Sequence, residues 1–328
     1  MNTLKLQGDL ATDVDTAARL LQQGELVAVP TETVYGLAAN AADPEAVNGI
    51  FVAKGRPADH PLIVHLPSVD QLPQWAIDIP ETARQLAQAF WPGPLTLLLH
   101  KHPDVSPVIT GGLDTIGLRV PAHPVLLDLL HTAGIGVAAP SANPYKKLSP
   151  TTAIQVFETL QGKIAAVLDG GPCEVGIEST IVDLTGVQVQ VLRPGPISAR
   201  QIADVLQQTV ATPEQHQVVV PGNVEEHYQP GKPLQLFSSV HMEQALQLRP
   251  DGIACVVHSP EYSDSLRPGD IMLSADPEGY AQALYQTLYQ LDQGPAEEIW
   301  LELPPMTDAW QAVNDRLLRA GKVVGDRG

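Results

Sequence analysis

Short apolar runs alternate with amphipathic stretches through the first 205 residues. Residues 12–23 repeat apolar positions at helical spacing and end at Gly24, so they predict a helix. Residues 26–30 (LVAVP) predict a buried strand. The same alternation predicts helices at 44–53, 81–90, 124–132 and 151–160, and strands at 62–66, 95–99, 116–120, 137–139, 166–168, 180–184 and 187–192. Several strands follow one another too closely for a crossover helix, so we expect a mixed, open α/β sheet.

Between residues 209 and 233 this periodicity disappears. The stretch contains four prolines and two glycines, which indicates an extended linker. Beyond it, the pattern predicts strands at 252–257 and 298–303 and helices at 275–291 and 307–322. We therefore expect a catalytic domain at 1–206, a linker at 207–235 and a smaller α/β domain at 236–328.

Charge and cysteine content narrow the classes of function. The chain has 19 basic and 37 acidic residues, a net charge of −18, which repels phosphate polymers. We therefore expect no stable binding of duplex nucleic acid. No apolar run approaches the roughly 18 residues of a membrane-spanning helix. Cys173 and Cys255 match no metal-ligand spacing, and without a secretory leader they indicate reduced thiols in the cytoplasm.

The common nucleotide and hydrolase motifs are absent from the sequence. It contains no GxxxxGK[ST], HExxH or GxSxG. Residues 134–139 fit the spacing GxGxx[GA], but they follow a helical pattern and run into Pro140. A dinucleotide fingerprint follows a strand and opens a helix, so we attribute this match to chance.

Five local groups of polar residues carry the candidate chemistry, and two lie early in the chain. Residues 30–37 (PTETVYGL) place Thr31 and Thr33 at the end of a predicted strand, where open α/β sheets bind ligands. Either threonine also fits an ordinary helix cap. Lys54 and Arg56 flank a glycine, so both can reach a polyphosphate, and the same residues also fit a solvated loop.

The other three groups surround later predicted strands. Arg119 lies in an apolar strand and needs an anionic partner, either a structural carboxylate or the carboxylate of a substrate. Residues 138–143 (AAPSAN) allow close approach of a nucleotide, while Ser149, followed by proline, also fits a helix N-cap. Residues 176–180 (GIEST) and Arg193 add hydroxyls and a cation at strand ends.

Taken in order, these groups form a recognisable set. PTETVYGL, KGRP, HPLIVH, FWPGPLTLLL, TIGLRVP, APSAN, SPT, GIESTIVDL and LRPG follow one another between residues 30 and 195. They resemble the YrdC-like threonylcarbamoyl-AMP synthase family. Residues 227–230 (HYQP) and 312–320 (AVNDRLLRA) resemble its longer, two-domain form. The resemblance implies a twisted, open, mixed α/β sheet with helices around a concave pocket, and a smaller Rossmann-like C-terminal domain.

The resemblance also implies a reaction. L-threonine, bicarbonate or CO2, and ATP would give threonylcarbamoyl-AMP and pyrophosphate, which makes the enzyme a nucleotidyltransferase. Mg2+ is expected to arrive bound with ATP, because polyphosphate chemistry commonly recruits that ion. A tRNA threonylcarbamoyl transferase complex would then pass the group to an adenosine of tRNA.

Site residues follow from the same resemblance. The residues implied for ATP are Lys54, Arg56, His60, Thr115, Ser141, Asn143, Ser149, Arg193 and Tyr228. The residues implied for threonine are Thr33, His65, Arg119, Ala139 and Ser179. Lys54 and Arg56 are expected to be catalytic through charge stabilisation of the triphosphate. His65 either acts as a base for the amine or only forms hydrogen bonds.

The chain departs from the family pattern at two places. Residues 144–147 (PYKK) stand where a Ser-Gly pair usually follows SAN, and Glu225 and Glu226 replace basic residues before His227. The first departure changes the loop that the resemblance places at the nucleotide. The second removes phosphate contacts from the linker.

The linker also contains apolar side chains that need a surface to cover, Val218 to Val220 and Tyr228. We expect it to lie over the pocket of the first domain as a lid, with Tyr228 at the nucleotide. A mobile tether whose tyrosine packs against either domain is the alternative.

Two other classes of function remain open. A module that binds structured RNA would need a basic face. A carbamoyl-adenylate enzyme of hydrogenase maturation contains a similar domain, but would carry additional zinc-finger and acylphosphatase-like regions.

Overall fold

The structure, a computed structural model, describes residues 2–213, 218–222 and 227–325. Contacts within the chain divide it into two units. The first comprises residues 1–145, 150–174 and 178–223, and the second comprises 146–149, 175–177 and 224–328. Two short segments from within residues 1–206 therefore group with the second unit.

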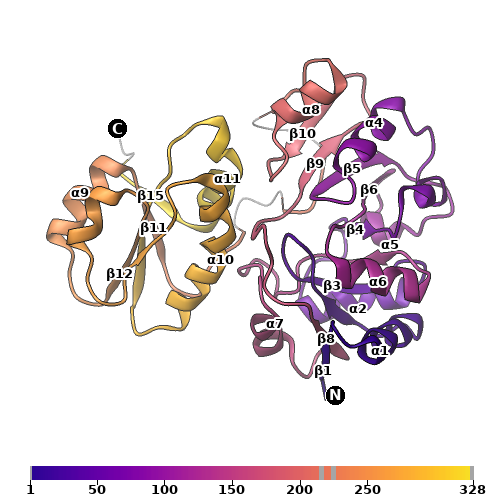
Figure 1. Cartoon of the computed structure of the whole chain (residues 1–328), viewed down its shortest axis with the longest axis horizontal. Coiled ribbons are helices and arrows are strands. Elements are labelled where there is room, and N and C mark those ends of the chain that lie inside the picture. The colour runs from indigo at the N-terminus through magenta and orange to yellow at the C-terminus, as the bar shows by residue number, and fades with distance from the viewer. Residues whose placement is uncertain (1, 214–217, 223–226, 326–328) are drawn as a thin grey trace. The chain divides into compact units, whose positions relative to one another are not determined.

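Ten strands form one mixed sheet in the described residues of the first unit, in the order β1-β8-β2-β3-β7-β4-β6-β5-β9-β10 (Figure 1). They are β1 (Leu4–Gln7), β2 (Val27–Val29), β3 (Gly36–Asn40), β4 (Ile63–His65), β5 (Leu95–His100), β6 (Thr115–Arg119), β7 (Val137–Ala138), β8 (Ala166–Asp169), β9 (Thr180–Asp183) and β10 (Gln190–Arg193). β4 and β6 are parallel, whereas β5 and β6 are antiparallel. The expected mixed α/β sheet is confirmed.

Helices of this unit cover both faces of the sheet. They are α1 (Ala11–Gln22), α2 (Pro44–Lys54), α3 (Leu72–Trp75), α4 (Glu81–Phe90), α5 (Pro107–Thr110), α6 (Pro124–Ala133), α7 (Ala153–Leu160) and α8 (Ala199–Leu206), with a 3-10 turn η1 (Val69–Gln71). Alternate strand residues point to opposite faces. One core joins α2, α4, α5, α7 and α8 to residues such as Val64, Leu97 and Leu118. The other joins α1 and α6 to residues such as Val29 and Val137.

The face that α1 and α6 cover continues across β4, β6, β5, β9 and β10. There, Ile63, Leu98, Ile181 and Leu192 form a separate cluster with Val220 of the linker. Val220 is buried, and Val218 packs partly buried against the same cluster. A described part of the linker therefore covers this half of the face.

The second unit is built on a parallel sheet. Five strands in its described residues have the order β13-β12-β14-β11-β15, and each strand runs parallel to its neighbours. They are β11 (Leu234–Phe237), β12 (Ile253–Val257), β13 (Ile271–Met272), β14 (Glu298–Glu302) and β15 (Lys322–Val324). The helices are α9 (Ser239–Leu248), α10 (Pro277–Gln293) and α11 (Gln311–Ala320), with 3-10 turns η2 (Pro260–Ser265) and η3 (Asp308–Trp310). The expected Rossmann-like α/β unit is confirmed.

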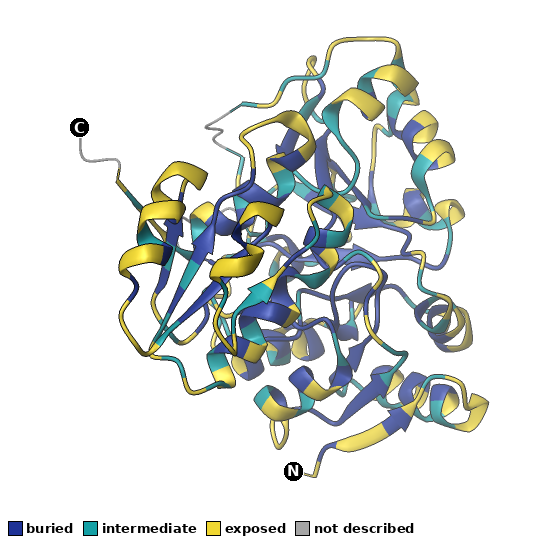
Figure 2. Cartoon of the chain, turned by 60° about the vertical axis from the view of Figure 1, so that its left-hand side comes forward, coloured by how far each residue is buried: buried dark blue, intermediate teal, exposed yellow. Residues whose placement is uncertain are grey.

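Burial follows the layers in both units. Strands are mostly buried, whereas the outward faces of the helices are exposed (Figure 2). Charged side chains are buried as well as apolar ones. Arg316, on the buried face of α11, has 0% exposure.

Candidate active site

Several of the candidate side chains lie together at one end of the central strands of the first sheet, which we call the strand edge. His65 at the end of β4 pairs with Arg119 at the end of β6. β5 begins beside the end of β6, with Leu97 opposite Leu118, and β9 begins beside β5, with Thr180 opposite Leu95. Arg193 ends the antiparallel β10 at the same edge. The mixed topology therefore brings ends of some strands and starts of others together.

Arg119 is the centre of this edge. Its side chain is 4% exposed and forms an ion pair with Glu32, which also accepts a hydrogen bond from the backbone N–H of Ala122 at 3.1 Å. Nε of Arg119 donates to the carbonyl of Gly93, and Nη1 donates to Oγ1 of Thr33, each at 3.1 Å. The anionic partner in the structure is thus a structural carboxylate. These contacts occupy three of the five guanidinium N–H groups, so two stay available toward a ligand.

A local turn holds Glu32 and Thr33 toward Arg119. Thr31 Oγ1 accepts from the backbone N–H groups of Thr33 and Val34, at 3.0 and 3.1 Å, and donates to the carbonyl of Val34 at 2.6 Å. The helix-cap interpretation of Thr31 and Thr33 is wrong, because the chain continues into strand β3. The hydroxyls close a turn between two antiparallel strands instead.

His65 is buried beside Arg119, with 3% exposure. Burial, and then the positive charge of Arg119, lower the pKa of His65 to about 3. The imidazole is therefore neutral near pH 7, and within the described residues its buried Nδ1 has no hydrogen-bond partner. A group with so low a pKa is a poor base at neutral pH, so the geometry favours a hydrogen-bonding role.

Ser179 and Arg193 form a second linked group at the same edge. Arg193 donates from Nε to the carbonyl of Ser179 and from Nη2 to its hydroxyl, both at 3.0 Å. Nη1 of Arg193 donates to the carbonyl of Pro221 in the linker at 3.0 Å. The hydroxyl of Ser179 also lies 2.8 Å from that of Thr96. Arg193 therefore ties the described linker segment to the strand edge.

Lys54 belongs to another group, at the loop that follows β7. The lysine ends α2, is 4% exposed, and donates to the carbonyls of Ser141 and Asn143, each at 2.5 Å. Burial, and then the nearby Arg56, lower the pKa of Lys54 well below its usual value. The solvated-loop interpretation is wrong for Lys54, because its ammonium is buried and holds the Ser141–Asn143 backbone.

Arg56 and His60 lie next to this group. Nη2 of Arg56 donates to the carbonyl of Pro61 at 2.9 Å, and the ring of His60 packs edge-on against Tyr145, with centroids 5.6 Å apart. Burial, and then Arg56, lower the pKa of His60. Thr115 begins β6, so four strand steps of about 3.3 Å separate it from Arg119. Thr115, a nucleotide candidate, and Arg119, a threonine candidate, thus lie at opposite ends of one strand.

The remaining predicted residues are Ala139, Ser149 and Tyr228. Ala139 follows β7, where its backbone N–H donates to the carbonyl of Ile63 at 3.1 Å. Ser149 and Tyr228 are buried and belong to the second unit. The N-cap interpretation of Ser149 is wrong, because Thr152 caps α7 through a capping box with Gln155.

Sequence reasoning missed several contributors to the site. Glu32 lies within residues 30–37, but its sequence position does not identify it as the partner of Arg119, and Gly93 contributes only its carbonyl. Thr96 binds Ser179 through its hydroxyl, although it lies among leucines in residues 95–99. A lone threonine in an apolar strand was the available signal for Thr96.

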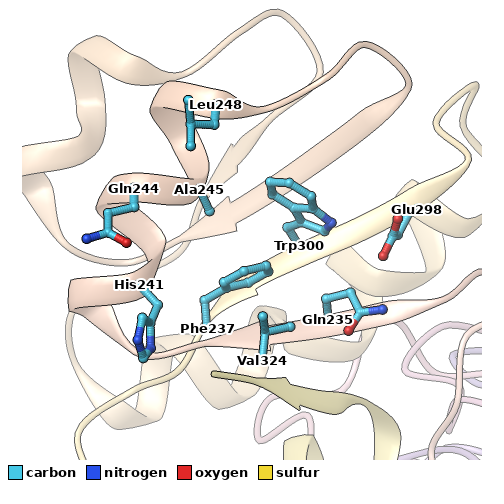
Figure 3. Close-up of a pocket in the computed structure, with 9 residues that line it drawn as sticks. All are labelled: Gln235, Phe237, His241, Gln244, Ala245, Leu248, Glu298, Trp300 and Val324. Carbon is cyan, nitrogen blue, oxygen red and sulfur yellow. The ribbon is translucent and has the colours of Figure 1, made fainter. Parts of the chain in front are cut away.

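A separate groove of about 560 Å3 lies in the second unit, between α9 and the sheet (Figure 3). Phe237, Ala245, Leu248, Trp300 and Val324 give it an apolar lining, with Glu298 at one side. None of the predicted site residues lines this groove. Across the described ranges of the chain, no helix is long and apolar enough to cross a membrane.

Two family models that match the chain define it as a two-unit α/β enzyme of the Sua5, YciO and YrdC class. The family model described as telomere recombination matches residues 19–195, and the model of the threonylcarbamoyl-AMP synthase C-terminal domain matches residues 197–321. The chain belongs to the threonylcarbamoyl-AMP synthase family, so the resemblance stated from the sequence is confirmed.

Individual relatives agree with this assignment. A threonylcarbamoyl-AMP synthase of Bacillus subtilis is 39% identical over 322 residues, which are 94% of this chain and 93% of that protein. The enzyme of the same name from Pyrococcus abyssi is 53% identical over 190 residues, but the match covers 58% of this chain and 56% of that relative. A solved structure of P. abyssi Sua5 complexed with L-threonine has a TM-score of 0.89 and 35% identity, over 98% of this chain and 100% of that one.

We expect replacement of Arg119 by methionine to cost about 3–5 kcal/mol of unfolding free energy, because it leaves Glu32 charged and unpaired in the interior. The double variant Arg119→Met/Glu32→Gln should recover much of this loss. Urea unfolding at constant m-value measures both effects. Equal destabilisation in the single and double variants would show that the ion pair is not what anchors the turn.

The low pKa of His65 predicts a pH dependence of stability. Below pH 6.5 the imidazole of His65 binds a proton in the unfolded chain but not in the folded protein. The free energy of unfolding therefore falls as the pH drops from about 6.5 toward 3. The slope from this group approaches about 1.4 kcal/mol per pH unit. Unfolding of wild type and His65→Gln between pH 4 and 8 should show a shallower slope for the variant below pH 6.5 and parallel curves above it. Parallel curves throughout contradict the assignment.

Proposed function

We propose that the chain is an L-threonylcarbamoyladenylate synthase, a nucleotidyltransferase that uses ATP, L-threonine and bicarbonate or CO2. The observation that supports this most directly is the match of both units to the family, including its C-terminal domain. The name of the relatives and the L-threonine in the P. abyssi complex agree with it. The product would be consumed by a tRNA threonylcarbamoyl transferase.

The reaction needs positioning rather than a covalent enzyme intermediate. The amine of threonine captures CO2 and loses a proton to give a carbamate, and a carbamate oxygen then attacks the α-phosphorus of ATP. The bond from that phosphorus to the bridging oxygen breaks, and pyrophosphate leaves with the electron pair. Catalysis by the protein is therefore orientation of two ligands and stabilisation of charge.

The edge around Arg119 suits a small amino acid. Two guanidinium N–H groups remain for a carboxylate, and the neutral His65 and the hydroxyl of Ser179 offer hydrogen bonds nearby. Thr33 is already oriented by Arg119. We assign threonine to these residues, with the backbone at Ala139 as a further contact.

The group around Lys54 suits the nucleotide. Lys54 fixes the backbone of Ser141 and Asn143, and Arg56 adds a second cation one residue beyond Gly55. We propose that Arg56 grips the triphosphate, that Lys54 contributes its positive potential, and that the remaining predicted ATP residues contact the rest of the nucleotide. MgATP is the expected substrate form, because polyphosphate chemistry commonly recruits Mg2+ to neutralise the phosphate charge.

Pyrophosphate release with each substrate omitted in turn tests the function. We expect release from MgATP to require both L-threonine and bicarbonate, because the carbamate is the nucleophile. The nucleotide product, separated by chromatography, should carry label from both threonine and bicarbonate. Release at the full rate without threonine would overturn the proposal and indicate a simple nucleotide hydrolase.

Replacing Arg56 by lysine tests the triphosphate assignment. Lysine keeps the charge but loses the planar fork, so we expect kcat/KM for ATP to fall by roughly 10–100-fold while thermal stability changes little. Arg84→Lys, an exposed position on α4, is the matched control and should behave as wild type. Wild-type kinetics for Arg56→Lys would mean that Arg56 is only a loop residue.

A further inference from the structure

Tyr228 adopts an unusual backbone conformation. Its φ is +60°, in the left-handed region that side chains other than glycine and asparagine seldom occupy. The side chain is nevertheless 1% exposed. A strained conformation of this kind persists only where surrounding contacts fix it, and such residues cluster at functional sites.

Aromatic and cationic side chains of the second unit fix the ring of Tyr228. Tyr285 of α10 stacks on it, with ring centroids 5.8 Å apart and planes inclined by 27°. The guanidinium carbon of Arg316 lies 5.5 Å from the ring centroid, within the range of a cation–π contact. Arg316 is completely buried, so this contact is shielded from water, where a cation–π contact is stronger than at an exposed site.

The backbone on both sides of Tyr228 is also held. The N–H of His227 donates to the carbonyl of Arg319 at 3.1 Å, and the N–H of Gln229 donates to the carbonyl of Lys146 at 2.9 Å. The carboxylate of Asp315 accepts from Arg316 at 2.8 Å and from Arg319 at 3.1 Å. One turn of α11 thus fixes the ring of Tyr228 and the backbone before it.

We propose that Arg316, supported by Asp315 and Tyr285, is a positioning residue for Tyr228. Arg316 then holds one linker tyrosine in a fixed, strained conformation. This inference rests on the proposed function, in which Tyr228 contacts ATP. Threonine binding, which is assigned to the edge around Arg119, should not depend on Arg316.

Kinetics of Arg316→Lys test the consequence for catalysis. Lysine keeps a charge but cannot lay a planar guanidinium against the ring. We expect kcat/KM for ATP to fall by roughly 10–100-fold, as in Tyr228→Ala, with KM for threonine within about twofold of wild type. Arg249→Lys is the matched control, since Arg249 is buried in the same unit but pairs with Asp270 and should leave the kinetics unchanged.

The contacts of Arg316 and Tyr285 with the ring of Tyr228 form a clamp on this residue. Hydrogen–deuterium exchange of the full chain tests this clamp without relying on activity. Amide exchange at His227 and Gln229 should accelerate in Arg316→Lys, and it should not change in Arg249→Lys. Tyr285→Leu is the second variant, should Arg316→Lys fail to fold, and it should accelerate the same amides.

The outcomes separate the two proposals. Unchanged exchange at both amides in the folded variants overturns the clamp. Accelerated exchange with wild-type kinetics overturns the positioning role. An equal rise in KM for threonine and for ATP would also overturn it, because a general loss of structure would produce that result. A wild-type chain that releases no threonine-dependent pyrophosphate overturns the proposed function, while exchange still decides the clamp.

Discussion

A buried guanidinium cannot be left without partners, and this constraint organises the edge of the first sheet. Arg119 binds the carboxylate of Glu32, the hydroxyl of Thr33 and the carbonyl of Gly93. These groups come from the turn after β2 and from the segment before β5, which are far apart in the sequence. Because the unpaired charge would be so costly, the three segments converge at one place.

The same charge sets the electrostatics around it. His65 is paired with Arg119 across two parallel strands, so burial and a neighbouring cation both disfavour its protonation. Lys54 and Arg56 repeat this arrangement at the other group, where burial and a like charge disfavour the ammonium. Because little water screens these buried groups, an anionic ligand beside them would strongly favour their protonated forms.

The linker is a structural element rather than a spacer in the residues where it is described. Val220 is buried against Ile63, Leu98 and Ile181, and Pro221 accepts from Arg193. Further along, Tyr228 is held against Arg316 and Tyr285 within the second unit. Whether these anchored segments act as a lid over the nucleotide stays a prediction, but each has the packed surface that its apolar side chains require.

The sequence by itself determined most of the alternation of helices and strands, the mixed sheet, a smaller second α/β unit and the family, because local periodicity and ordered motifs carry that information. It did not determine strand β3, because the polar residues just before it indicate a ligand-binding loop or a helix cap. It also did not determine the cap of α7, which is Thr152 instead of Ser149. Only the tertiary structure decided that Glu32 pairs with Arg119, that Lys54 is buried, and that Tyr228 meets Arg316. These contacts join residues distant in the chain, and the free energy that selects them comes from burial and pairing of charges, which no local pattern records.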